Sequence, residues 1–170
     1  QVINLDGGVR VRVLFTPGHS PDSLCYYIEE EGVLFSGDTV LGSSTTTVHD
    51  LAAYRGSLKQ LLELPKLDVM CPGHGEVSHD PRERLQMYLT HRENRERQIT
   101  EALHEGGVMT SWDIMLKLYP EINSRLRRAA DGNVQAHLRQ LDSEGRLSTY
   151  EGVPKEKPGQ TPAEILEHER

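Results

Sequence analysis

Short apolar runs, each bounded by Gly, Pro, Asp or Ser, fill the chain from residue 1 to about residue 81. The four clearest runs are VRVRVLF, LCYYI, GVLFSGD and LDVMCPGHG. Runs of this length between turn residues are typical of strands in a buried sheet. In the first run, apolar side chains alternate with Arg or Leu, and the alternating set is Val9, Val11, Val13 and Phe15. This alternation predicts a strand that turns one face to the core.

Helical spacing of apolar residues predicts one helix within this region and others after it. The first helix is expected over residues 50–64, with Asp50 as its N-cap and Pro65 as its stop. A long charged helix is expected over residues 82–105, where Gly106 and Gly107 end the pattern. The middle of that helix, HRENRER, is polar on every side, which favours a solvated connector between two packed bodies.

The remaining elements predict a small second domain. Thr110 and Ser111 are candidate N-caps for a short helix that reaches residue 119, a further helix is expected over residues 132–144, and RLSTY is a candidate strand. Together with the long helix before them, these elements make three helices and a strand, which is the layout of a winged-helix domain. The chain therefore divides into residues 1–81, residues 82–150 with a linker helix and a winged-helix-like domain, and residues 151–170, expected to be a flexible tail with at most a short helix.

Composition narrows the functional classes. The net charge is -7, so the whole molecule repels polyanions unless its basic residues gather on one face. The apolar runs are all too short to span a membrane, and the two cysteines form no CxxC pair, which favours a reducing compartment. We therefore expect an intracellular protein, cytoplasmic or mitochondrial, with no membrane partner. Because the sequence starts without Met and within an apparent element, we also expect it to be a fragment.

Three short phrases carry the candidate chemistry: TPGHS, SGDT and PGHG. Each places a polar side chain directly after a glycine, in the turn that follows a strand-like run, and these side chains are His19, Asp38 and His74. Imidazole and carboxylate groups are ligands that suit Zn²⁺. Each phrase alone is also compatible with an ordinary turn in which the side chain makes a local hydrogen bond. The phrases are 19 and 36 residues apart, so any joint site must be made by the fold.

Taken in this order, the three phrases resemble the second half of the metallo-β-lactamase-fold hydrolases, and residues 16–103 resemble the beta-lactamase-like protein 2 group. The resemblance implies an α/β fold: the C-terminal half of an αββα metallo-β-lactamase sandwich, followed by a small winged-helix-like domain. It also implies two zinc ions in the intact protein. His19 and His74 match metal ligands of the family, and Asp38 matches the carboxylate that bridges the metals.

The rest of the family pattern is missing from this sequence. The family takes its other ligands, and the aspartate that orients the attacking water, from an HxHxDH phrase that does not occur here. The chemistry implied is attack by a zinc-activated hydroxide, with no general base that can be identified in this chain. A sheet of about four strands would also leave a broad apolar face uncovered. We therefore expect the isolated chain to be catalytically inert or nearly so.

Other reactive residues have plainer interpretations. We expect His79 to serve a turn, His49 to help cap the helix that follows it, and His91 to be a solvated helix residue. We expect Cys25 and Cys71 to pack as small apolar side chains beside the sheet.

Three functional hypotheses follow. The first is an endoribonuclease acting on single-stranded RNA, which the resemblance admits and which ten arginines between residues 82 and 146 favour. Glutamates interleave the first of these arginines, however, which is also the pattern of a solvated helix face. The second hypothesis is a thioesterase or glyoxalase-II-like hydrolase of thioester small molecules. The third is a non-enzymatic winged-helix interaction module. For the appended domain, the resemblance implies a part in the substrate channel or in a homodimer interface.

Overall fold

The computed structural model describes residues 1–149 and 162–165 of the chain. The chain divides into two compact units, Gln1–Arg92 and Glu93–Arg170, and each is described by itself.

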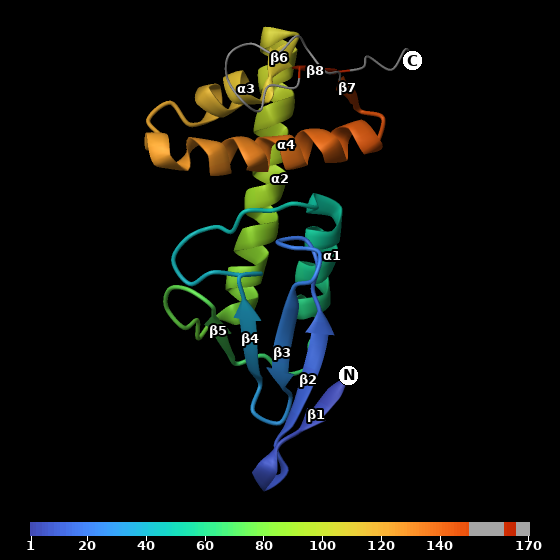
Figure 1. Ribbon diagram of the computed structural model, residues 1–170, viewed down its shortest axis with the longest axis vertical. Coiled ribbons are helices and arrows are strands. Elements are labelled where there is room, and N and C mark those ends of the chain that lie inside the picture. Colours follow the sequence, from blue (N-terminus) through green and yellow to red (C-terminus); the bar gives the residue numbers. More distant parts are fainter. Residues whose placement is uncertain (150–161, 166–170) are drawn as a thin grey trace. The chain divides into compact units, whose positions relative to one another are not determined.

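The first unit is built on a five-stranded sheet with the strand order β1-β2-β3-β4-β5 (Figure 1). Neighbouring strands are antiparallel from β1 to β4, and β4 and β5 are parallel. A single turn of 3-10 helix, η1, covers Asp6–Gly8 between the first two strands. The strands are β1 (Val2–Asn4), β2 (Arg10–Phe15), β3 (Leu24–Ile28), β4 (Val33–Gly37) and β5 (Val69–Pro72).

Two helices accompany the sheet, and both were predicted. Helix α1 covers Leu51–Leu62 and makes the crossover that a parallel β4-β5 pair requires. Its N-cap is Asp50, whose side chain accepts a hydrogen bond of 2.9 Å from the backbone N–H of Ala53. Helix α2 covers Pro81–Gly106, within one residue of the predicted bounds. The predicted strands and helices of this region are therefore confirmed.

The core of the first unit lies on one face of the sheet. Strand residues that point to this face include Leu14, Tyr27 and Leu34, and they pack against apolar side chains of α1 and α2. The helix residues in this core are Leu51, Tyr54, Leu58, Leu61, Leu85, Tyr88 and Leu89. The core therefore sits between the sheet and the two helices.

The other face of the sheet is apolar and open among the described residues. Registered pairs place Val13, Tyr26, Phe35 and Cys71 in one row across four strands. Phe35 is 44% exposed, and Phe15 is 58% exposed. The alternation predicted for β2 is present, but its valine and phenylalanine set faces the open side, and Leu14 is the β2 side chain that is buried. The expectation of a broad uncovered apolar face is met.

The second unit contains α3 and α4 with a three-stranded sheet of order β6-β8-β7. Its core includes Ile114, Val134, Leu138 and Leu141. Helix α4 begins five residues before the predicted start, because the chain passes directly into it from a 3-10 turn and Gly132 is accommodated inside the helix. The elements are β6 (Met109–Thr110), α3 (Ser111–Leu118), η2 (Ser124–Leu126), α4 (Arg127–Ser143), β7 (Leu147–Thr149) and β8 (Pro162–Ile165).

Two stretches of the chain differ from their prediction. The HRENRER stretch is not solvated on every side, because Arg92 is buried and His91 is half-buried. The predicted tail, 151–170, lies outside the described residues except for 162–165, which form β8 and pair with β6 and β7. The sequence did not predict this strand.

Candidate functional site

The three candidate ligands follow strands that end at the same edge of the sheet. β2 is antiparallel to β3 and β3 to β4, so β2 runs in the same direction as β4 and β5. His19 follows β2, Asp38 follows β4 and His74 follows β5. The topology therefore brings to one edge three residues that are far apart in the sequence.

Asp38 and His74 lie next to each other. The Nε2 atom of His74 is 3.7 Å from the Oδ1 atom of Asp38, and the two side chains are 78% and 40% exposed, respectively. The backbone around them is closely packed, because a Cβ atom at Gly73 would lie 2.7 Å from the Asp38 carboxylate. A contact between side chains this exposed contributes little to stability. Its exposure instead leaves both groups accessible to a ligand.

His19 is held through one ring nitrogen. Its Nδ1 atom lies 2.9 Å from the carbonyl oxygen of Thr47 and 2.9 Å from the hydroxyl of Thr46. Because a carbonyl oxygen can only accept, the Thr47 contact is a hydrogen bond in the tautomer that carries the proton on Nδ1, and this N–H then donates to Thr47. The lone pair of the ring is then on Nε2, which is the arrangement that metal-binding histidines adopt.

The donor chemistry fits a divalent metal such as zinc: two imidazoles and one carboxylate, one imidazole oriented by a carbonyl. Among residues 1–149 and 162–165, no group of three or more His, Cys, Asp or Glu side chains is arranged to hold an ion. The structure thus brings Asp38 and His74 together and places His19 at the same edge, without joining all three into one cluster. Their role as ligands stays a prediction.

The other reactive residues have structural roles. Asp50 supplies the capping side chain of α1, and the part in capping expected of His49 stays a prediction. Cys25 is fully buried in β3, and burial raises the pKa of its thiol, which disfavours a thiolate nucleophile. Cys71 is half-buried in β5.

Thr46 and Thr47, which seat the His19 ring, were not identified from the sequence. They stand in the run TTT, which carries no motif. Only the folded loop shows that this run lies beside a residue 27 positions earlier.

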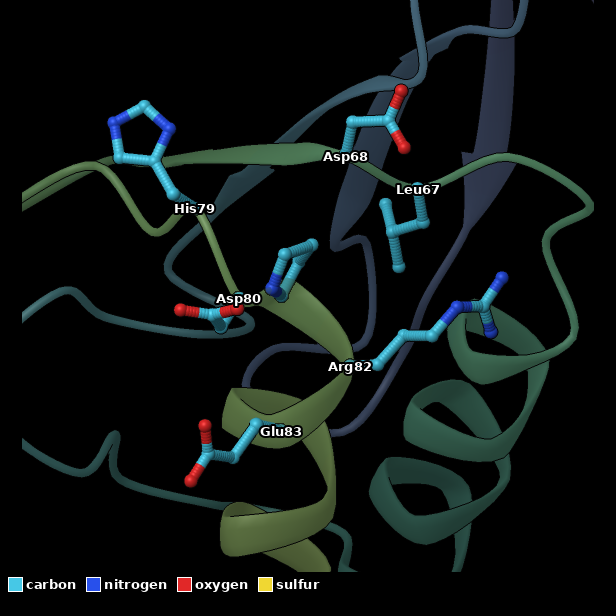
Figure 2. Close-up of a pocket in the computed structure, with 7 residues that line it drawn as sticks. Leu67, Asp68, His79, Asp80, Arg82 and Glu83 are labelled. Carbon is cyan, nitrogen blue, oxygen red and sulfur yellow. The ribbon is translucent and has the colours of Figure 1, made fainter.

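A separate cavity of about 330 Å³ lies at the start of α2 (Figure 2). It is lined by Leu67, Asp68, His79, Asp80, Pro81, Arg82 and Glu83. The Arg82 side chain extends to the end of α1, where it donates hydrogen bonds to the carbonyl oxygens of Leu62 and Leu64. Asp68 lies before β5 and His74 after it, so this cavity and the candidate ligands belong to opposite ends of that strand. At this cavity, Arg82 therefore links the start of α2 to the end of α1.

The arginines that favoured RNA binding are largely engaged within the protein. Two of them contact backbone carbonyls or an aromatic ring in the first unit, and three contact side chains in the second. These pairs are Arg82 with Leu62 and Leu64, Arg92 with Thr46 and Tyr54, Arg95 with Tyr119, Arg97 with Asn94 and Glu101, and Arg146 with Glu96 and Glu144. The arginine count is therefore a weaker indication of a phosphate-binding surface than the sequence implied.

The described helices include none that is both long enough and apolar enough to cross a bilayer.

Two family descriptions match the chain. Residues 1–74 match the family described as metallo-beta-lactamase superfamily, and residues 110–153 match the beta-lactamase associated winged helix domain. These matched ranges correspond to the first unit's sheet and to the second unit.

Similar proteins agree with both matches. The chain is 36% identical over 151 residues to the beta-lactamase-like protein 2 homolog of Drosophila melanogaster, which covers 88% of this chain and 51% of that protein. It is 42% identical over 103 residues to the atrochrysone carboxyl ACP thioesterase of Aspergillus fumigatus, covering 61% of this chain and 32% of that protein. A crystal structure of a metallo-beta-lactamase family protein from Thermus thermophilus superposes with a TM-score of 0.80 at 29% identity, over 98% of this chain and 52% of that one. The chain thus spans at most about half the length of these relatives.

Proposed function

The chain belongs to the metallo-beta-lactamase superfamily and carries a beta-lactamase associated winged helix domain, and on this basis we propose that the native protein is a metal-dependent hydrolase of thioesters. The single observation that supports the site is the Asp38 and His74 pair at the sheet edge where β2, which leads to His19, also ends. These groups have the donor chemistry of a zinc site and are exposed to substrate.

Each residue has a defined part in this proposal. His19 would bind the metal through Nε2, with Nδ1 held by Thr47, and Asp38 and His74 would supply the neighbouring ligands. We keep the expectation of two zinc ions in the native protein, with Asp38 as their shared ligand. When bound, zinc lowers the pKa of a coordinated water towards about 7 and polarises the carbonyl that is attacked. Gly73 keeps the space beside the Asp38 carboxylate clear of a side chain.

Two observations favour a thioester over RNA. A relative that is 42% identical over 103 residues is named a thioesterase. At least five of the ten arginines that favoured RNA have partners within the protein, which reduces the cationic surface available for phosphates. The RNA hypothesis therefore becomes one outcome of the test.

The test uses the native protein loaded with zinc and three chain variants: wild type, Asp38→Ala and Asp68→Ala. Asp68 is an exposed carboxylate at the other end of β5 and serves as the control. We expect release of thiol from a small acyl thioester by the wild type and by Asp68→Ala. Loss of a metal ligand should lower kcat/KM at least about 100-fold in Asp38→Ala, with the circular dichroism spectrum unchanged because the side chain is exposed.

The same preparations are then incubated with end-labelled single-stranded RNA. Cleavage of RNA that depends on Asp38, without thioester hydrolysis, would replace the thioester proposal with the endonuclease hypothesis. Hydrolysis of either substrate at equal rates by the wild type and Asp38→Ala would contradict the proposed site.

A further inference from the structure

Arg92 is a buried arginine on α2 that the hydrolase chemistry does not use directly. It is 1% exposed, and its Nη2 atom donates a hydrogen bond of 2.6 Å to the carbonyl oxygen of Thr46. Its guanidinium carbon lies 5.5 Å from the centre of the Tyr54 ring. Burying a guanidinium has a large desolvation cost, so the contacts made at this position must offset it.

The residue that Arg92 holds is the one that contacts His19. Thr46 is 2% exposed, and its hydroxyl lies 2.9 Å from the Nδ1 atom of His19. The next residue, Thr47, accepts the His19 Nδ1–H bond on its carbonyl. Two consecutive residues, Thr46 and Thr47, therefore contact both the arginine and the imidazole.

The stretch of chain that leads to Thr46, residues 39–46, is anchored at its beginning, beside Asp38. The Tyr54 hydroxyl donates to the carbonyl of Thr39, which follows Asp38, at 2.6 Å. Burial raises the pKa of Tyr54, so its hydroxyl stays protonated and able to donate. In the middle of the segment, the Tyr88 hydroxyl accepts from the Leu41 N–H at 2.9 Å and donates to Ser44.

Tyr54, Tyr88 and Arg92 thus form one buried polar group that fixes residues 39–46. This segment connects the candidate ligand Asp38 to Thr46 and Thr47, the residues that contact the His19 ring. Loss of the Arg92 hydrogen bond would affect the position of the His19 ring directly, because Thr46 contacts both the arginine and the imidazole.

We propose that Arg92 is a positioning residue for the metal site: by holding the Thr46 carbonyl it keeps Thr46 and Thr47 where they fix the His19 ring as the Nδ1–H tautomer. The proposal rests on the proposed function for the use of His19 as a ligand. Without this anchor the ring can rotate and exchange tautomers, and its Nε2 lone pair is presented for only part of the time. Groups that orient a metal-binding histidine in this way typically change metal affinity by about 10- to 100-fold.

The test compares Arg92→Met with Arg82→Met in the native protein. Arg82 is the matched control, because it is on the same helix and also donates to backbone carbonyls, at the end of α1. The first readout is the tautomer of His19 in metal-free protein, from the ¹⁵N shifts of its ring. We expect the Nδ1–H tautomer in the wild type and in Arg82→Met, and a mixture of tautomers in Arg92→Met.

The second readout is zinc affinity, measured by competition with a chromophoric chelator. We expect Arg92→Met to bind zinc about tenfold or more weakly than Arg82→Met. A folded Arg92→Met protein with the tautomer and zinc affinity of Arg82→Met would overturn the proposal. The tautomer readout needs no metal and no substrate, so it separates failure of this inference from failure of the proposed function.

If Arg92→Met does not fold, variants of Thr46 test whether this segment fixes the His19 ring. Thr46→Val removes the hydroxyl beside His19 but keeps the carbonyl that Arg92 holds, and Thr46→Ser restores the hydroxyl. We expect weakened zinc binding and a changed His19 ring signal in Thr46→Val, with recovery in Thr46→Ser. Equal zinc affinity and equal His19 signals in these two variants would overturn the role of this segment.

Discussion

Gly18, the residue before His19, lies against the backbone of α1. Its φ is +133°, and a Cβ atom built on it would lie 2.4 Å from the Cα atom of Tyr54. Its carbonyl accepts hydrogen bonds from the N–H groups of His49 and Asp50 at the start of the helix. This glycine therefore fixes the turn that carries His19 against α1.

Gly18→Ala should destabilise the first unit by more than about 2 kcal/mol, because the new methyl group overlaps backbone atoms and φ is unfavourable for alanine. Gly56→Ala is the control: this glycine is inside α1 and nothing lies within 4 Å of its added Cβ, so the substitution should stabilise by about 0.5 to 1 kcal/mol. Urea unfolding followed by circular dichroism measures both changes. Equal stability of the two variants would show that the close approach at Gly18 is not structurally required.

At the scale of residues, the sequence was sufficient to identify candidate ligands where a potential metal-binding side chain stands in a predicted turn. His19, Asp38 and His74 each follow a glycine in a turn after a strand, and the structure places all three at one edge. The contacts that hold the His19 ring could not be predicted, because Thr46 and Thr47 are 27 and 28 positions away in the sequence. Such contacts depend on a loop path that local pattern does not determine.

At the scale of elements, α4 carries an ionisable group whose burial affects stability. Asp131 is 4% exposed, and burial raises the pKa of its carboxyl, although hydrogen bonds from Ser111 and Gln135 act in the opposite direction. Because the folded state then binds its proton more tightly than the unfolded state, this group adds stability at low pH. That stability is lost as the pH rises from the unfolded pKa, about 3.9, through the higher folded pKa.

Asp131→Asn should remove this dependence. As the pH rises through that window, the free energy of unfolding of the wild type should fall relative to that of Asp131→Asn. Gln135→Ala, which removes a donor to the carboxylate and keeps the ionisable group, is the comparison variant. Urea unfolding at several pH values provides the measurement. A difference between wild type and Asp131→Asn that does not change with pH would contradict the raised pKa.

The elements themselves were mostly predictable, and the exceptions have physical reasons. Arg92 falls in the apolar stripe of α2, three positions after Leu89 and seven before Ile99, so its burial could have been inferred from helical spacing. Its charge instead favoured a solvated position. The start of α4 was missed because Gly132 resembles a boundary, although the surrounding packing keeps it helical.

At the scale of the whole molecule, β2, β4 and β5 run in the same direction, and this common direction brings the three candidate ligands to one edge. The sequence predicted strands but not their order, so it could not show that the three residues share one edge of the sheet. The open apolar face that includes Phe15, Tyr26 and Phe35 follows from the same topology, because α1 and α2 both cover the opposite face. The candidate site therefore depends on the fold as much as on the three residues.

The metal content of the native protein shows whether the candidate residues bind zinc. Zinc bound per molecule and its affinity are measured in the wild type, in His74→Ala and in His79→Ala, the last being an exposed histidine five residues away that we do not assign as a ligand. We expect zinc in the wild type and in His79→Ala, and at least a roughly tenfold loss of affinity in His74→Ala. Equal zinc content and affinity in all three proteins would contradict this expectation.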